Sequence, residues 1–408
     1  MDADALVAAV AGYAPRVHAA ALATGPAHHV ASPLGAWIVL ALAADALEGE
    51  AREAAAGHLG APVDEAVGAA VALLDEPHPA VAAAVACWSN GAALGERLGS
   101  WVGRLPAEVE AGPVPTQVVA DRWAAARTAG LVDRFPVAVD PVTVLVLASA
   151  LATKVTWAQP FAVAEAAELG GPWADEVGRV LTRTGATHLA DTEAAGRVVV
   201  TMAESLTDLA VLTVTAAPEV PPVEVIAAAH ELAALPAPSA ARLSLFDVPL
   251  GPGHSWDLVE EVEARATTAE RVEEDTVVLP AWTATSDHRL LTDDRFGFTA
   301  VVAHLLAALP PHPDGWEADA AQAAVARYGR LGFEAAAVTA LGMRAGSARP
   351  PEPHPVPVRT LHARFGHPHA VVAVATQRRW DRVPAWFGPW DRLPVFSAWV
   401  AEPAEVTD

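Results

Sequence analysis

The chain has 408 residues, of which 53 % are hydrophobic and 18 % charged, so it is too apolar for a disordered polymer and long enough to bury a sizeable core. Its formal net charge of -23 disfavours nucleic acid and anionic membrane surfaces as partners. The single cysteine, Cys87, excludes an internal disulfide and a zinc–thiolate cluster, and we expect it to be a small buried residue.

No linker interrupts the sequence, so we expect a single domain over residues 1–408. The start, Met1 to Ala5, lacks the cationic stretch of a secretory signal, which predicts a cytoplasmic location by default and leaves export by another route open. Apolar runs such as Leu34 to Ala44 and Val144 to Ala152 are shorter than the roughly 18 residues that span a bilayer, so we interpret them as core elements.

The amino-terminal third is predicted to be mainly helical. Apolar residues recur with a helical period from Ala5 to Leu22, and a second helix is expected from Leu34 to about Leu47, after the start signal Ser32-Pro33. A short apolar run, Val81 to Trp88, is interpreted as a strand. Further helical patterns lie around it, at Ala51 to Leu59, Val63 to Leu74 and Gln117 to Leu131.

Strand patterns dominate the following part of the chain. Val142 to Leu151 is apolar on both faces, which is typical of a strand in the middle of a sheet. A helix is expected at Phe298 to Leu309. Other strand-like stretches are Arg197 to Met202, Leu209 to Thr215, Arg242 to Val248 and Thr276 to Leu279.

A proline-rich stretch from Pro350 to Pro357 indicates an exposed, extended connection. The segment before it, Gly332 to Arg349, contains no proline and can therefore still hydrogen-bond as a strand. Composition by itself favours a short helix at Glu334 to Leu341, and both interpretations stay open at this point. Read as a strand, one face of the segment holds Phe333, Ala335, Ala337, Thr339, Leu341 and Met343.

The first part of this segment resembles the reactive-loop hinge of the serpin family, in which an acid and a run of small residues follow a glycine. Other stretches resemble serpin signatures in the same order along the chain. The abundance of alanine and arginine, with Lys154 as the sole lysine, looks like the bias of a GC-rich genome. Within the family, the resemblance is to a bacterial, actinobacterial-like serpin. The matching stretches are Ser32-Pro33-Leu34, Asp45 to Leu59, Asp121-Arg122-Trp123 with Thr128 and Gly130, Leu145 to Phe161 with Lys154 and Trp157, Phe365 to Pro368, and Leu393 to Pro403.

The resemblance implies an α+β serpin fold with a large central sheet, additional sheets, about eight or nine helices and an exposed reactive-centre loop at about 332–357. It implies a monomeric serine protease inhibitor, neither an enzyme nor a cofactor or metal protein, whose cleaved loop inserts into the main sheet and traps a trypsin-like or subtilisin-like protease. The residues it implicates are the hinge Gly332, Phe333, Glu334, Ala335, Ala336, Ala337, Val338 and Thr339; the scissile region Met343, Arg344, Ala345, Gly346 and Ser347; and the sheet-opening region Ser32, Ser149, Trp157 and Gln322.

Two departures from the family pattern bear on this mechanism. Phe333 replaces the small residue that usually follows the hinge glycine, and because it would enter the sheet first, we expect it to slow insertion. Gly35, Ser149 and Gln322 stand where the family often has serine, asparagine and histidine, which we expect to weaken the polar network beneath the sheet. The alternative is therefore a non-inhibitory serpin scaffold that serves as a binding or chaperone-like protein.

The sequence also contains fragments of two other kinds of site, a hydrolase nucleophile and a histidine metal site. The run Gly253-His254-Ser255-Trp256-Asp257 begins like a hydrolase nucleophile elbow, but its fifth residue is not glycine. The histidines have neither the spacing of a metal motif nor a supporting cysteine, so we interpret them as surface or core residues; they are His28, His29, His362, His367 and His369.

Overall fold

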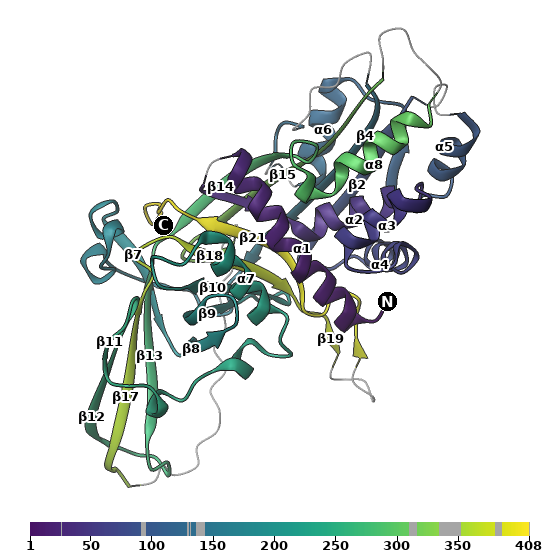
Figure 1. Ribbon diagram of the computed structural model, residues 1–408. Coiled ribbons are helices and arrows are strands. Elements are labelled where there is room, and N and C mark those ends of the chain that lie inside the picture. The colour runs from purple at the N-terminus through teal and green to yellow at the C-terminus, as the bar shows by residue number, and fades with distance from the viewer. Residues whose placement is uncertain are drawn as a thin grey trace. The chain divides into compact units, whose positions relative to one another are not determined.

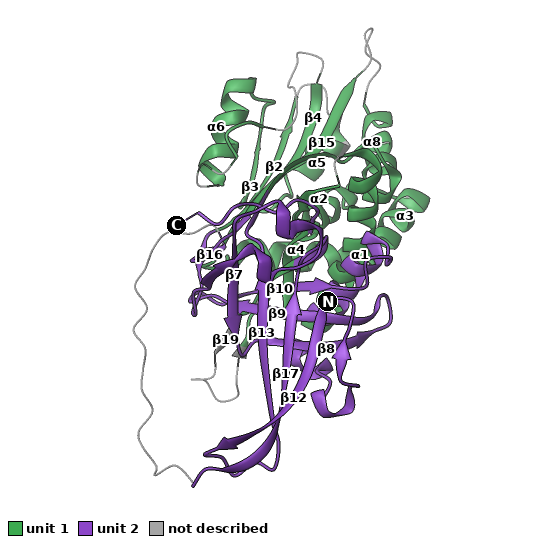
Figure 2. Ribbon diagram, turned by 90° about the vertical axis from the view of Figure 1, so that its left-hand side faces the viewer, with its two compact units in different colours: residues 1–153, 284–326, 372–398 green, residues 154–283, 327–371, 399–408 purple. Residues whose placement is uncertain are grey.

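The computed structural model describes residues 1–25, 27–90, 95–128, 130, 132–135, 143–309, 316–333, 352–379 and 386–407. These residues form two compact units, each built from three separate stretches of the chain (Figure 2). Unit 1 comprises residues 1–153, 284–326 and 372–398, and unit 2 comprises residues 154–283, 327–371 and 399–408.

Unit 1 contains seven of the eight α-helices found in the described residues (Figure 1). They are α1 (Ala3–Thr24), α2 (Pro33–Ala44), α3 (Gly49–Leu59), α4 (Val63–Asp75), α5 (Gly95–Val102), α6 (Gln117–Arg127) and α8 (Phe298–Ala307). The strands wholly in this unit are β1 (His29–Ala31), β2 (Val81–Ser89), β3 (Val109–Gly112), β4 (Thr143–Thr153), β19 (Arg378–Arg379) and β20 (Trp386–Phe387). Four further strands have residues in both units: β14 (Trp282–Arg289), β15 (Glu317–Tyr328), β18 (His369–Ala375) and β21 (Leu393–Val400).

The main sheet of unit 1 has the strand order β3-β2-β4-β15, and β14 pairs with the other edge of β15. All eleven residues of β4 are buried, which confirms the predicted central strand at Val142 to Leu151. One face of the sheet packs against an aromatic cluster of Trp88, Trp123 from α6 and Phe135, with the two tryptophan rings 5.1 Å apart. Cys87 is buried in β2, as expected.

Helix α2 begins where the sequence predicts. The Ser32 hydroxyl caps it by accepting a hydrogen bond from the Gly35 amide, and Pro33 occupies the first turn. Every residue of α2 is buried, so it is a core helix that is apolar all round. In the described residues, α1 is long and apolar enough to cross a membrane by length and composition, but its buried residues and the Tyr13 hydroxyl, which donates to the Phe296 carbonyl, make it a core helix of unit 1.

Unit 2 is built mainly of strands. One sheet has the order β11-β12-β17-β13-β7-β6, and β10, β9 and β8 follow one another in a second sheet. Among its described residues the one α-helix is α7 (Pro222–Ala233). The strands are β5 (Val155–Thr156), β6 (Ala162–Glu165), β7 (Arg179–Thr184), β8 (Thr187–Thr192), β9 (Gly196–Glu204), β10 (Leu209–Thr215), β11 (Gly251–Pro252), β12 (Trp256–Arg265), β13 (Val272–Leu279), β16 (Gly332–Phe333) and β17 (His354–Arg364).

Three expectations from the sequence are wrong. Arg242 to Val248 is not a strand but includes a 3-10 turn at Leu245–Asp247, where the Ser244 side chain caps the turn. The helix expected to reach Leu131 ends at Arg127, because Gly130 adopts the left-handed conformation, with φ at 81°, and its amide donates back to the Ala125 carbonyl at 2.8 Å.

The third correction concerns the proline-rich stretch, since Pro355 and Pro357 belong to β17 and not to a loop. Both prolines pair with β12, at Ala264 and Val262. Pairing of β17 with its other neighbour, β13, begins only at Val358. A proline lacks the amide donor that a second neighbour would require, so this strand accepts prolines only where one of its edges is unpaired.

Candidate functional site

The candidate site in unit 1 is the junction between β4 and β15. These strands run parallel and pair directly over seven positions, including Gln322 opposite Ser149. No strand lies between them over this length. Parallel pairing is slightly less stable per residue than antiparallel pairing. If an antiparallel strand were inserted between β4 and β15, the parallel ladder that joins them would be replaced by two antiparallel ladders, one on each side of the new strand.

Three of the four predicted sheet-opening residues meet behind this junction. The Gln322 side-chain oxygen accepts a hydrogen bond from the Ser32 amide at 2.8 Å, and its nitrogen donates to the Ser32 carbonyl at 2.8 Å and to the Ser149 hydroxyl at 3.3 Å. The Ser32 hydroxyl donates to the Val395 carbonyl at 2.6 Å. All three side chains are buried. The network therefore joins the start of α2 to both strands of the junction.

Gly35, Ser149 and Gln322, the three departures from the family pattern, lie close together in this network. A Cβ on Gly35 would lie 2.6 Å from Leu151 Cδ1 and 3.2 Å from the Gln322 side-chain nitrogen, so Gly35 leaves the room that this amide occupies. A glutamine offers one acceptor and two donors, and here it uses both kinds. Gly35 thus provides the space and Gln322 provides the hydrogen bonds, a relation that the two positions do not show when each is considered alone.

In unit 2, the first two hinge residues form the short strand β16. Phe333 pairs antiparallel with Tyr328 at the end of β15, and Gly332 and Phe333 pair antiparallel with Thr156 and Val155 of β5. The Phe333 side chain is 2 % exposed. This corrects the expectation that Phe333 has still to enter a sheet, because it is already bonded between two neighbours.

Phe333 is held by an aromatic cluster. Its ring centroid lies 6.4 Å from that of Trp157 and 6.1 Å from that of Trp282, and Trp282 stacks on Tyr328 at 6.1 Å. Trp157, the fourth predicted sheet-opening residue, also donates from its indole nitrogen to the Gly329 carbonyl at 3.0 Å. Trp157 therefore fixes both the ring of Phe333 and the turn before it.

Gly332 is required by close packing. A Cβ at this position would lie 2.1 Å from the Val155 carbonyl oxygen, a distance that backbone atoms cannot relieve without moving the strand. The turn from Tyr328 to Phe333 is closed by a hydrogen bond from the Gly329 amide to the Gly332 carbonyl at 3.0 Å. The hinge glycine is thus explained by the approach of β5.

The other predicted hinge and scissile residues lie outside the described residues. They are Glu334, Ala335, Ala336, Ala337, Val338, Thr339, Met343, Arg344, Ala345, Gly346 and Ser347. Sequence reasoning missed β15, Tyr328 and Trp282, all of which shape the site. Alanine-rich β15 carries little strand signal of its own, and the one usable sign was the glycine pair, Gly329 and Gly332, which marks a tight turn.

The run Gly253 to Asp257 lies in a hairpin between β11 and β12. The Ser255 hydroxyl is 2.8 Å from His367 Nε2 and 3.0 Å from His254 Nδ1. No helix starts there, so the strand-to-helix turn of a nucleophile elbow is missing at this serine. Ser255 and its histidines therefore join the hairpin to the segment before β18.

The remaining histidines considered as metal ligands are engaged in protein contacts. His29 Nε2 is 2.8 Å from His18 Nδ1, and His362 Nδ1 is 2.9 Å from the Thr276 hydroxyl. In the part of the chain that the structure describes, no group of three or more histidine, cysteine or acidic side chains is placed to hold a metal ion.

No protein-family model and no curated protein matches the sequence, but solved structures match the fold over nearly the whole chain. Serpin48 of the insect Tenebrio molitor, described as a highly specific serpin, is 15 % identical with a TM-score of 0.61, covering 98 % of each chain. Thyroxine-binding globulin in complex with thyroxine is 15 % identical with a TM-score of 0.60, covering 98 % of this chain and 99 % of its own. Tengpin, a thermophilic serpin in its native state, is 12 % identical with a TM-score of 0.60, covering 97 % of this chain and 94 % of its own.

The protein therefore has the serpin fold, an α+β fold with several sheets, as predicted.

Proposed function

We propose that this chain is a serpin that inhibits serine proteases as a suicide substrate. The observation that carries the proposal is the direct parallel pairing of β4 with β15, together with a hinge that already runs antiparallel to the end of β15 and to β5. This is the direction a strand inserted between β4 and β15 would take. The serpin fold supports the same reading.

The chemistry takes place in the protease. Its serine oxygen forms an ester with the loop carbonyl carbon, the peptide C–N bond breaks, and the leaving amine takes a proton from the protease histidine. Water would normally hydrolyse the ester. Insertion of the loop carries the attached protease away and distorts its oxyanion hole and histidine, which removes several kcal/mol of transition-state stabilisation and leaves the ester intact.

The free energy for insertion comes from new backbone pairing and burial. An added strand of about a dozen hydrogen bonds, each worth roughly 0.5 to 1.5 kcal/mol net, supplies on the order of 10 kcal/mol. The uncleaved protein is then metastable, held by a kinetic barrier. The Ser32–Gln322–Ser149 network contributes to this barrier, because the bond between Gln322 and Ser149 has to break when β4 and β15 separate.

The observed registers predict where the inserted loop would pair. Phe333 is opposite both Tyr328 and Val155, and in antiparallel pairing each residue forward along the loop moves one residue back along either neighbour. Six residues on, both counts bring Thr339 opposite Gln322 and Ser149, which are each other's partners in the uncleaved protein. The two independent counts agree, which supports insertion in this register.

Two matched arginine variants test the proposal. By the same count, Ala337 would lie opposite Ala324 and Leu151, which are both buried, whereas Glu334 would lie opposite Arg327 and Lys154, which are both exposed. Ala337→Arg should abolish the detergent-resistant complex with trypsin-like and subtilisin-like proteases, and Glu334→Arg should retain most of it. Loop cleavage should raise the Tm of the wild type by roughly ten degrees or more, and no rise would reject insertion.

The target protease depends on which bond is cleaved. Cleavage after Arg344 would indicate a trypsin-like target, and cleavage after Met343 or Gly346 a subtilisin- or elastase-like one. Mass spectrometry of the released carboxyl-terminal fragment identifies the bond directly.

A second candidate function is ligand or protein binding without inhibition. Thyroxine-binding globulin, which shares this fold, is described in complex with thyroxine, so the fold also carries binding proteins. In that case the cleaved loop would give neither a covalent complex nor a rise in Tm.

A further inference from the structure

Three buried histidines lie together in unit 1, around strand β1. They are His18 of α1, His29 of β1 and His288 of β14. The ring centroids of His18 and His29 are 5.0 Å apart, and those of His29 and His288 are 6.2 Å apart. Histidine is the side chain whose ordinary pKa lies nearest to neutral pH, so this histidine cluster is a place where a small change of pH can act on the fold.

Two of the rings form a chain of hydrogen bonds in which the proton positions are fixed. His29 Nδ1 is 2.7 Å from the Ala27 carbonyl oxygen, so Nδ1 carries the proton and Nε2 is an acceptor. His18 Nδ1, which is 2.8 Å from His29 Nε2, must therefore be the donor in that bond. His18 Nε2 is then an acceptor, and the Ser397 hydroxyl donates to it at 2.6 Å. Both nitrogens of His29 are thus engaged while the ring is neutral, and a second proton would point at a donor.

The third histidine attaches β1 to the main sheet. His288 Nε2 donates to the Val30 carbonyl at 2.7 Å, and the Ser286 hydroxyl, on the same strand, accepts from the Val30 amide at 3.1 Å. β14 pairs with β15, whereas β1 pairs with β21 and ends one residue before Ser32. When β15 separates from β4, β14 has to move with it, and the two bonds to Val30 resist this movement.

Protonation of His29 would place a charge in the histidine cluster without a counter-ion among the described residues. Burial lowers the pKa of His29 to about 4 and also lowers the pKa of His288. The titratable groups that act on His29 through space are His28 and His288, and both oppose a further positive charge. β21 carries no ionisable residue, and Asp287 of β14 is exposed on the face opposite His288. The other charged groups on the packed elements form bonds elsewhere or are exposed; they are Asp2, Asp4, Arg16, Arg289, Asp293, Asp294 and Arg295.

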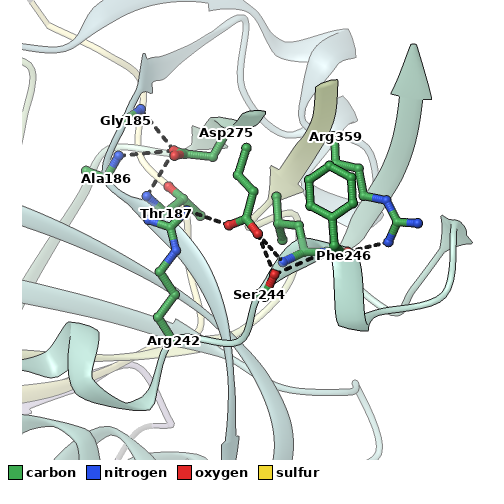
Figure 3. A network of polar contacts seen from close by, with 10 residues as sticks. Gly185, Ala186, Thr187, Arg242, Ser244, Phe246, Asp275 and Arg359 are labelled. Carbon is green, nitrogen blue, oxygen red and sulfur yellow. Dashed lines mark hydrogen bonds and ion pairs between the residues drawn. The ribbon is translucent and has the colours of Figure 1, made fainter. Parts of the chain in front are cut away.

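A buried charge in unit 2 shows what the histidine cluster lacks. The Asp275 carboxylate accepts hydrogen bonds from the three backbone amides of residues 185–187, at 3.0, 3.0 and 2.9 Å (Figure 3). A protonated His29 would keep one acceptor, the Ala27 carbonyl oxygen, and its new proton would meet the proton on His18 Nδ1. A buried charge with an unsatisfied donor is costly, so His29 binds a second proton only after its ring has left the cluster.

We propose that β1 and its bonds to β14 form an acid-sensitive latch on the main sheet. Below about pH 6, His29 leaves the cluster and takes up a proton, β1 detaches from β14, and β4 and β15 separate more readily. The consequence for loop insertion rests on the proposed function, whereas the latch itself does not.

Hydrogen exchange at the amides of residues 27–32, followed by mass spectrometry on the full uncleaved chain, measures the latch directly. Each rate is divided by the intrinsic exchange rate at the same pH. If release returns His29 to its ordinary pKa of 6.5, opening should be about fourfold more frequent at pH 6 than at pH 7.5, about tenfold at pH 5.5 and roughly 30-fold at pH 5. Unchanged opening at pH 5.5 would overturn the proposal, because carboxylates with ordinary pKa values titrate at lower pH.

Two histidine substitutions in unit 1 provide the matched comparison. His29→Gln keeps a donor for the Ala27 carbonyl and an acceptor for His18 but cannot take up the proton, so its opening should change less than about twofold between pH 7.5 and 5.5. His304→Gln, on α8 and outside the cluster, should keep the increase of about tenfold. Equal acceleration in both variants would mean a general acid effect and would reject the latch. If His29→Gln does not fold, the pH profile of the wild type decides, since an increase that begins only below about pH 5 contradicts the proposal.

The consequence for inhibition is measured separately. Uncleaved wild type held at pH 5.5 and returned to pH 7.5 should lose the capacity to form the detergent-resistant protease complex about tenfold faster than protein kept at pH 7.5, and His29→Gln should not. Faster exchange without faster loss of this capacity would overturn the coupling of the latch to the main sheet. A chain that forms no complex at any pH would refute the proposed function, and the exchange measurement would then decide the latch by itself.

Discussion

Phe333→Ala removes the ring that docks the base of the loop against Trp157 and Trp282. Truncating a buried phenylalanine typically costs about 3–5 kcal/mol, and because β16 is only two residues long and can relax, we expect about 3 kcal/mol. The free energy of unfolding and the Tm of the uncleaved protein should both fall. Under the proposed mechanism the ring is docked before and after insertion, so the rise in Tm on loop cleavage should stay close to that of the wild type.

Phe333→Ala should change the rate of loop insertion more than it changes the rise in Tm that follows loop cleavage. In the wild type the hinge is docked before cleavage, whereas in the variant docking has to occur during insertion. The apolar contacts of the ring contribute about 2 kcal/mol of the total loss in the variant. A barrier to insertion that is higher by this amount corresponds to roughly 30-fold slower insertion, which lets more protease escape. Stopped-flow fluorescence of the tryptophans after loop cleavage measures the rate, and Phe333→Leu, which keeps most of the apolar volume, should restore it to within about threefold. An unchanged insertion rate in Phe333→Ala would refute this reasoning.

Three further predictions concern the glycine turn, the buried network and the histidines. Gly332→Ala should displace the hinge, because its Cβ would lie 2.1 Å from the Val155 carbonyl oxygen, whereas Gly329→Ala meets nothing closer than 3.9 Å; comparable Tm values for the two variants would contradict this. Gln322→Ala leaves the Ser32 amide and carbonyl without that partner and should lower the free energy of unfolding by about 2 kcal/mol in urea titrations, and no loss would show that the network is not stabilising. Burial lowers the pKa of His29 to about 4, so between about pH 6.5 and 4 the unfolded chain binds a proton at this ring that the folded protein does not. The free energy of unfolding should therefore fall by about 3 kcal/mol on acidification through this window. His29→Gln should remove this part of the pH dependence of urea unfolding, and an unchanged pH dependence would contradict the assignment.

Several parts of the fold are determined by the sequence alone, since their signals are local. Ser32-Pro33 predicted the start of α2, because a capping hydroxyl and a proline in the first turn act within one turn of helix. The apolar run at Val142 to Leu151 predicted the central strand β4, because burial on both faces leaves no polar position. Resemblance to the family also selected Ser32, Ser149 and Gln322, which the structure brings together.

Only the tertiary structure decided what these residues do. β15 is rich in alanine and carries little strand signal, so its place beside β4 depends on pairing with residues more than a hundred positions away. The same holds for Phe333: the sequence shows a bulky residue where a small one is usual, but not that Trp157 and Trp282 enclose it. Local patterns report which residues can form a helix or a strand, whereas register and enclosure are set by distant neighbours that no short window contains.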